Sequence, residues 1–196
     1  MRLRHILIFS VIAISFVSCF SDENTAPKPK TYMCLDVPKP SYKTFSESYL
    51  PFTFSYPDYG VIEKTQGQGT SHNWFNINFA SYGCKLYVSY MPMNSVKMMD
   101  TLVNDCYTFL QRHQDVANGL LERVYSSPKT KVYGTVFEIK GEGVTSTYQF
   151  YVTDSVHNFL RGALYFDYKA NNDSIAPIIQ RLKTDLDFMI SSLRWK

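Results

Sequence analysis

The stretch that decides the fold runs from Lys131 to Tyr168 and reads KVYGTVFEIKGEGVTSTYQFYVTDSVHNFLRGALYFDY. It contains three runs rich in aromatic and β-branched residues, which favour strands. Two turn signals separate the runs, Gly-Glu-Gly at 141–143 and Thr-Asp-Ser at 153–155. The sequence therefore predicts a three-stranded antiparallel meander. Its middle run, 147–152, carries aromatic residues at both alternating positions, so we expect a central strand covered on both faces.

Further strands are predicted upstream of the meander. Phe52, Phe54 and Tyr56 alternate with polar residues, which points one aromatic face inward. Residues 73–80 and 85–91 are two more strand-like runs with a short turn between them, and a hairpin is their natural arrangement. Residues 120–126 return to strand character after the first predicted helix.

Two segments have the period of an amphipathic helix. In the first, apolar residues recur three or four apart at Met99, Val103, Cys106 and Leu110. The second carries a longer apolar stripe, made of Ile175, Ile178, Leu182, Leu186, Met189 and Leu193. Lys183, Asp185 and Asp187 are expected to lie off that stripe.

The predicted order is strands, helix, strands, helix. Because strands and helices do not alternate strictly, a doubly wound parallel sheet is not expected. The sequence predicts an α+β fold in which an antiparallel sheet is sandwiched with two amphipathic helices. These helices lie either one on each face or both on one face. Residues 32–196 are expected to form this single domain.

The N-terminus has the features of an export signal. Arg2 and Arg4 precede an apolar run from Ile6 to Val17, which is too short to span a bilayer comfortably. Ser18 and Cys19 close the run as a lipoprotein signal does, so residues 1–18 are predicted to be removed and Cys19 to carry lipid. Residues 19–31 would then be a tether to the membrane. An ordinary secretory signal with an incidental cysteine is the alternative.

Charge and cysteine content exclude some classes of protein. Removing Arg2 and Arg4 from 20 basic residues leaves 18 against 17 acidic ones. No basic stripe remains, so nucleic acid is not an expected partner. Cys34, Cys84 and Cys106 show no metal-ligand spacing, and their odd number leaves at least one thiol outside any internal disulfide. Cys84 and Cys106 are expected to be small buried core residues.

Motifs of known enzyme classes are missing from the sequence, so we expect neither catalysis nor a cofactor. Asp154, Ser155 and His157 lie in one predicted turn. A catalytic triad instead needs groups that converge from separate parts of a fold. These three residues are interpreted as turn residues.

Arg161 is the most informative charged residue, because it lies in the apolar run 159–166 beside Gly162. A buried guanidinium needs a partner, and Asp154 or Glu138 could form an ion pair with it. An arginine exposed at a sheet edge is a second possibility. A third is contact with a partner protein, with the glycine giving room for it.

Several motifs in this chain resemble the GldD family of gliding motility lipoproteins of Bacteroidetes. They are residues 51–57 (PFTFSYP), 131–134 (KVYG), 146–155 (STYQFYVTDS), 159–166 (FLRGALYF) and the closing Arg-Trp-Lys. The resemblance extends from about Tyr32 to Lys196. The aromatic strand near the start and the C-terminal helix are also similar to PsbP-like α/β sandwiches, which implies fold alone.

The family resemblance implies an outer-membrane lipoprotein needed for gliding motility and for type IX protein secretion. Its partners would be other gliding and secretion lipoproteins and outer-membrane components. It implies no catalytic residue, and we therefore expect a non-catalytic assembly or stability factor. The alternative is a lipoprotein that binds a small ligand or the cell wall, or an undetected hydrolase, through a cleft lined by tyrosines and Trp74. The sequence leaves open whether the domain faces the periplasm or the cell surface.

Overall fold

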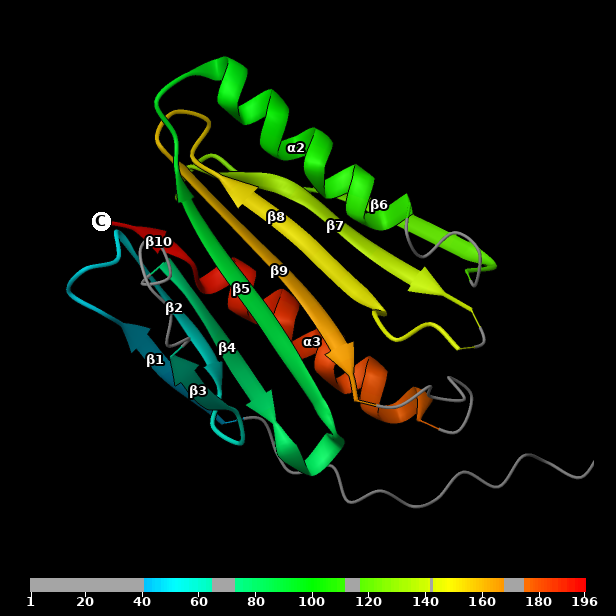
Figure 1. The fold of residues 1–196 in the computed structure, drawn as a ribbon. Coiled ribbons are helices and arrows are strands. Elements are labelled where there is room, and N and C mark those ends of the chain that lie inside the picture. Colours follow the sequence, from blue (N-terminus) through cyan, green and yellow to red (C-terminus); the bar gives the residue numbers. More distant parts are fainter. Residues whose placement is uncertain (1–40, 65–72, 112–116, 142, 168–174) are drawn as a thin grey trace, which may run out of the picture. The chain divides into compact units, whose positions relative to one another are not determined.

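The predicted meander lies inside a large antiparallel sheet in the computed structural model of the chain (Figure 1). The structure describes residues 41–64, 73–111, 117–141, 143–167 and 175–196. The chain divides into two units, residues 1–32 and 33–196, and every described residue belongs to the second. The predicted signal segment, Cys19, the tether and Cys34 lie outside the described residues.

Within the described residues, seven strands form the large sheet in the order β3-β4-β5-β9-β8-β7-β6, and neighbouring strands are antiparallel. In chain order the strands are β3 (Val61–Lys64), β4 (Trp74–Phe79), β5 (Cys84–Pro92), β6 (Gly119–Ser127), β7 (Val132–Lys140), β8 (Tyr148–Thr153) and β9 (Asn158–Phe166). The meander is β7-β8-β9, and the β4-β5 hairpin closes through a short 3-10 turn at Ala80–Tyr82. Both predictions are confirmed.

A small sheet and two helices complete the described part of the domain. The small sheet has the antiparallel order β1-β2-β10, with β1 at Tyr42–Ser46, β2 at Phe52–Pro57 and β10 at Arg194–Trp195. Helix α2 spans Val96–Gln111, and helix α3 spans Ala176–Ser192. No helix among the described residues is both long and apolar enough to cross a membrane.

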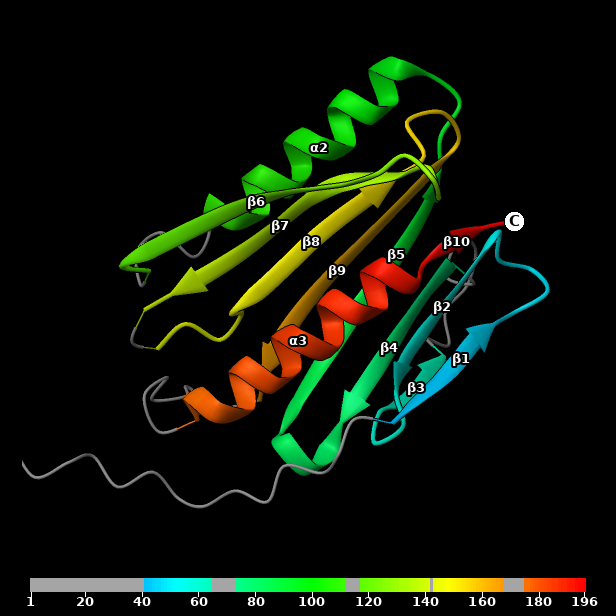
Figure 2. The same ribbon diagram turned by 180° about the vertical axis from the view of Figure 1, so that it is seen from behind.

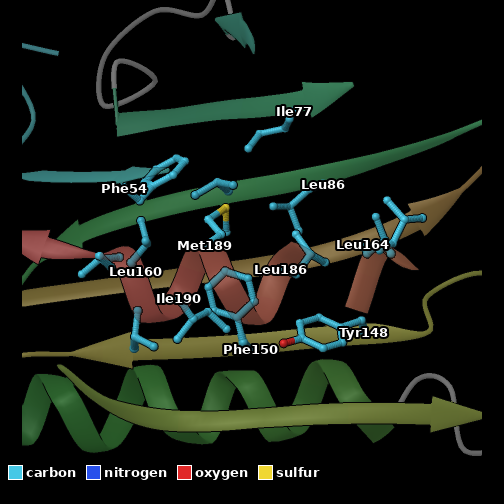
Figure 3. Packing of buried hydrophobic residues seen from close by; sticks show 14 of the residues in the cluster. Phe54, Ile77, Leu86, Tyr148, Phe150, Leu160, Leu164, Leu186, Met189 and Ile190 are labelled. Carbon is cyan, nitrogen blue, oxygen red and sulfur yellow. The ribbon is translucent and has the colours of Figure 1, made fainter. Parts of the chain in front are cut away.

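The main hydrophobic core lies between α3, the small sheet and one face of the large sheet, which we call the front face (Figures 2 and 3). The strands alternate, so β8 sends Tyr148, Phe150 and Val152 into this core. From α3, Leu186 and Met189 pack against them, and both are almost fully buried. This face therefore has the continuous packing that stabilises a domain of this size.

The opposite face of the large sheet, called the rear face, is covered by α2 (Figure 1). Phe137 and Ile139 of β7 meet Leu110 of the helix, and Phe159 of β9 meets Cys106. The two helices therefore lie on opposite faces, which decides between the arrangements that the sequence left open. The strand β8 is inside the sheet and covered on both faces, as predicted.

The apolar stripe of α3 is confirmed, but Asp185 is not off it. Its carboxylate is 1% exposed and accepts hydrogen bonds from Tyr42 Oη at 2.7 Å and Tyr59 Oη at 2.5 Å. Arg181, one helical turn earlier, donates to the same carboxylate through Nε at 2.6 Å. Burial, followed by the bond to Asp185, raises the pKa of Tyr42 to about 12. The stripe of α3 therefore includes one buried charged group, the carboxylate of Asp185, which is paired with Arg181 of the same helix.

The two described cysteines are free thiols in the core, as expected. Cys84 begins β5 and belongs to the front core, and Cys106 lies on α2 against the rear face. Burial raises the pKa of Cys84 to about 12 and that of Cys106 to about 11. A thiol with a raised pKa holds little reactive thiolate at neutral pH, so both are packing residues.

Candidate functional site

Arg161 lies on the rear face of β9 and does not meet a carboxylate. Its guanidinium carbon lies 4.0 Å from the centre of the Phe109 ring of α2. The side chain is half-buried, and no ion pair of Arg161 occurs among the described residues. A cation over the face of an aromatic ring is a stabilising arrangement.

The two carboxylates proposed as partners of Arg161 are engaged elsewhere. Glu138 accepts a bond of 2.7 Å from Lys183 Nζ of α3, on the front face. Asp154 lies in the β8-β9 turn. The ion-pair prediction for Arg161, Asp154 and Glu138 is therefore corrected, because strand alternation puts Glu138 on the opposite face and local backbone bonds hold Asp154.

Gly162 serves the front face and not the arginine beside it. A Cβ atom at Gly162 would lie 2.2 Å from Cε1 of Phe150, which is far closer than two carbons can approach. The missing side chain thus makes room for the Phe150 ring in the main core. The prediction that this glycine gives a partner access to Arg161 is wrong, although a partner contact by Arg161 itself stays a prediction.

Asp154 organises the β8-β9 turn. One of its oxygens accepts hydrogen bonds from the backbone N–H groups of Val156, His157 and Asn158 at 2.8–2.9 Å, and the other accepts from Asn158 Nδ2 at 2.7 Å. Burial raises the pKa of Asp154, but these bonds outweigh it and leave the pKa below its ordinary value. Ser155 follows with a left-handed φ of 67°. The interpretation as turn residues is confirmed.

This turn forms one wall of an open cleft of about 590 Å³. Asp154, His157 and Asn158 contribute from the β8-β9 turn. The second wall is the turn between β6 and β7, residues 129–131, and the third is the end of the chain from Arg194 to Lys196. Three segments that are distant in the sequence therefore meet here.

Hydrogen bonds join the walls of the cleft. Trp195 Nε1 donates to the carbonyl of Lys131 at 3.0 Å, which ties the small sheet to the β6-β7 turn. Lys196 Nζ donates to the carbonyls of Glu47 and Leu50 at 2.7 and 3.0 Å. Lys131 itself has a left-handed φ of 52°. The backbone of the cleft is thus fixed by contacts outside regular sheet pairing.

Positive charge dominates the cleft. Its lining residues include Lys129, Lys131, Arg194 and Lys196, and a single acidic side chain, that of Asp154. Both oxygens of Asp154 are taken up by its own turn. Among the residues that the structure describes, none of these four cations forms an ion pair.

The second exposed feature is β6, an edge strand of the large sheet. It is nine residues long and exposes Leu120, Leu121 and Val124 by 52%, 51% and 77%. Its two charged residues are held by the helices: Glu122 accepts a bond from Tyr107 of α2, and Arg123 is paired with Asp187 of α3 at 2.6 Å. The charges that usually guard an edge strand are therefore directed to the protein's own helices.

Sequence reasoning missed both features. Two of the cleft's cations come from the β6-β7 turn and two from residues 194–196, and no local sequence pattern shows that these segments converge. Trp74, expected in a ligand cleft, is 48% exposed on the rear face of β4, and the tryptophan in the cleft is Trp195. No group of three His, Cys, Asp or Glu that could hold a metal ion occurs in the part of the chain that the structure describes.

Comparison with known proteins identifies the family and agrees with the fold. The chain matches the gliding motility lipoprotein GldD family over residues 22–195. It is structurally similar to cyanobacterial PsbP (CyanoP) from Synechocystis sp. PCC 6803, known from a solution structure. The TM-score is 0.50 at 12% sequence identity, over 83% of this chain and 97% of that one. No sequence among the curated proteins matches the chain significantly.

The chain therefore belongs to the GldD family of gliding motility lipoproteins. The likeness to CyanoP shows the fold alone, and the predicted PsbP-like α+β architecture is confirmed.

Proposed function

We propose that this member of the GldD family is a non-catalytic assembly factor, anchored in the outer membrane by lipid on Cys19. It would act in gliding motility and type IX secretion by holding a segment of another protein of that machinery. Family membership supports the link to gliding. The observation that carries the binding role is the exposed edge strand β6.

An extended segment of a partner protein is the occupant that β6 fits best. Within the described part of the chain β6 pairs only with β7, so its outer backbone N–H and C=O groups can accept one more strand. Nine residues give a ladder of roughly 30 Å at about 3.3 Å per residue. Leu120 and Val124 would meet apolar side chains of the added strand on one face, and Leu121 would meet them on the other.

The sharpest test places a lysine on the outer edge. In the native host, Val124→Lys should abolish gliding and the export of type IX cargo, because the charge opposes strand addition. Val61→Lys is the matched control, since Val61 is 61% exposed on β3, the other edge strand of the same sheet. Protein level and membrane association should be unchanged in both variants.

Two outcomes would overturn the proposal. One is normal motility and export with Val124→Lys, or with the gene deleted. The other is a photo-crosslinker at position 124 that captures only a second copy of this chain, which would make β6 a dimer interface.

The anchor is tested separately. Cys19→Ala should release the protein from the membrane fraction and remove fatty-acid labelling. Wild-type protein that carries no fatty acid would contradict the lipid anchor. Protease treatment of intact cells would then show on which side of the outer membrane the domain lies.

A further inference from the structure

We propose that the cationic cleft binds a ligand bearing a phosphate group, either a soluble phosphate ester or a lipid headgroup. This site is separate from β6, and the proposal does not depend on the role given to that strand. It rests on three observations: the convergence of the cations, the absence of an ion pair for them among the described residues, and the fixed backbone around them. Arg194 and Lys196 donate hydrogen bonds to neutral backbone carbonyls, which leave their charge unbalanced.

Convergence of like charges is unfavourable unless an anion relieves it. The four cations come from two segments more than 60 positions apart in the chain, residues 129–131 and 194–196. Positive and negative residues are nearly equal in number after the predicted signal segment, so an excess of basic residues does not by itself explain four cations in one cleft. The repulsion among them is a cost that a bound anion would remove.

The charge of the cleft favours phosphate over a single carboxylate. One carboxylate carries one negative charge and would leave most of the cations unbalanced. A phosphate monoester carries about −1.5 to −2 at neutral pH and has three strong acceptor oxygens. Lysine acts on phosphate as a point charge, and arginine adds directed donors.

The neutral groups of the cleft suit a small organic phosphate. Thr130 and Asn158 line the cleft beside the cations, and they offer hydrogen bonds to hydroxyl or ester oxygens. The indole of Trp195 is half-buried there and offers an apolar surface. A volume of about 590 Å³ is within the range of small-ligand sites.

Trp195 provides a direct readout. The chain has two tryptophans, so Trp74→Phe leaves Trp195 as the single tryptophan, inside the cleft, and its emission can be excited selectively over that of the tyrosines. In this background the full chain, with Cys19→Ala for solubility, is titrated with pyrophosphate, with glycerol 1-phosphate and with glutarate at matched ionic strength. We expect saturable quenching or shift of the Trp195 emission with the two phosphates, weakened by added salt. Glutarate has a similar total charge but divides it between two separate carboxylates, so it should bind at least tenfold more weakly than a compact phosphate group with three acceptor oxygens.

The binding variant is Lys129→Gln with Lys131→Asn. Asparagine is chosen because it tolerates the left-handed backbone at position 131. The double variant should raise the Kd for glycerol 1-phosphate by about tenfold or more. Lys140→Gln, at the far end of β7 from the cleft, makes the same kind of charge change and should bind as the parent does.

Vesicles separate the two sources of phosphate. Binding to phosphatidic acid vesicles but not to phosphatidylcholine vesicles, competed by glycerol 1-phosphate, indicates a lipid headgroup. Binding of glycerol 1-phosphate without vesicle binding indicates a soluble ester, and either result supports the proposal. It is overturned if no phosphate compound binds, if glutarate binds as tightly, or if the double variant, folded by its thermal melt, binds as well as the parent.

The test is independent of the proposed assembly role. Val124→Lys should keep its phosphate affinity while losing motility. If the double variant loses its phosphate affinity while the cells still glide normally, the cleft is a phosphate-binding site that the assembly role does not require.

Discussion

The two faces of the large sheet are made by the same strands and are covered in different ways. On the front face, α3 and the small sheet bury a continuous layer that includes Phe52, Phe54 and Phe150. On the rear face, α2 packs over β7, β8 and β9, and the part over β4 and β5 exposes Trp74 and Tyr87 by 48% and 45%. The front face of the sheet is therefore fully covered, and the rear face is covered only in part.

Because of this difference, the front face contributes most of the stability of the domain, and the rear face keeps side chains accessible to solvent. Side chains alternate along a strand, so each strand can serve the core with one set of residues and the solvent with the other. In β9, Leu160 and Leu164 are completely buried in front, while Arg161 lies half-buried against Phe109 behind. We expect substitutions in front to lower the free energy of unfolding strongly, and substitutions behind to lower it little.

The largest expected effect is at the buried carboxylate in front. Asp185→Ala should lower the free energy of unfolding by about 3–5 kcal/mol, because it removes the buried carboxylate that accepts from Arg181 and from two tyrosine hydroxyls. The measurement is urea unfolding followed by fluorescence. Glu122→Ala, which removes an exposed acceptor of Tyr107 behind, should cost under about 1 kcal/mol. Equal costs for the two variants would remove the contrast between the faces.

A matched pair of leucines sharpens the comparison of the helices. Leu186→Ala in α3 empties a fully buried position and should cost about 2–5 kcal/mol. Leu102→Ala in α2 changes a partly buried position and should cost about 1 kcal/mol. Urea unfolding of both variants tests this, and a larger cost at Leu102 would show that the rear face carries the stability.

Gly162 tests how tightly the front face is packed. Gly162→Ala should cost about 1–3 kcal/mol, because the new methyl group meets the Phe150 ring. Gly119→Ala is the control, since its nearest neighbour would be Lys140 Cβ at 3.7 Å, an ordinary contact. The shift of Tm on thermal unfolding measures both. Adding Phe150→Leu should restore part of the loss at Gly162, and no restoration would argue against this clash as the cause.

The β8-β9 turn, which lines the cleft, should make the free energy of unfolding depend on pH. The pKa of Asp154 is lowered by folding, so its charged form stabilises the protein above the ordinary pKa of 3.8, and this contribution is lost as the pH falls through the lowered value. Asp154→Asn should therefore cost about 1–2 kcal/mol at neutral pH. The difference from wild type should shrink toward zero near about pH 2. Urea unfolding at several pH values checks this, and a difference that grows on acidification would refute it.

The smallest expected change in the free energy of unfolding is at Arg161, on the rear face. Arg161→Met should cost about 0.5–1 kcal/mol, because the contact with the Phe109 ring is lost and the aliphatic stem is kept. In a double-mutant cycle with Phe109→Leu, the two changes should be less than additive. A cost of several kcal/mol, measured by urea unfolding, would mean that Arg161 has a buried ionic role.

The sequence predicted the elements because their signals are local. Alternating aromatics specify β8, and the three-to-four spacing from Met99 to Leu110 specifies α2. Gly143, with a φ of 81°, sits in the first predicted turn of the meander, where a left-handed backbone favours glycine. The motifs that indicated the family are local too, and the family matches residues 22–195.

The partners of the charged residues could not be predicted, because they depend on which distant segments meet. Asp185 is polar in sequence, yet helix α3 turns it toward tyrosines that lie 126 and 143 positions earlier in the chain. Glu138 was expected near Arg161, but it faces Lys183 on the other side of the sheet. A pattern of residues cannot distinguish these outcomes before the faces are assigned.

By itself the sequence determined the fold class, the meander, the two helix stripes and the family, since periodicity and motifs are properties of neighbouring residues. The tertiary structure alone decided that the large sheet has one fully covered face and one that is exposed over β4 and β5. It also decided that Lys129 and Lys131 meet Arg194 and Lys196 in one cleft. Charges add through space and not along the chain, so a sequence of nearly balanced charge can still build a strongly cationic site.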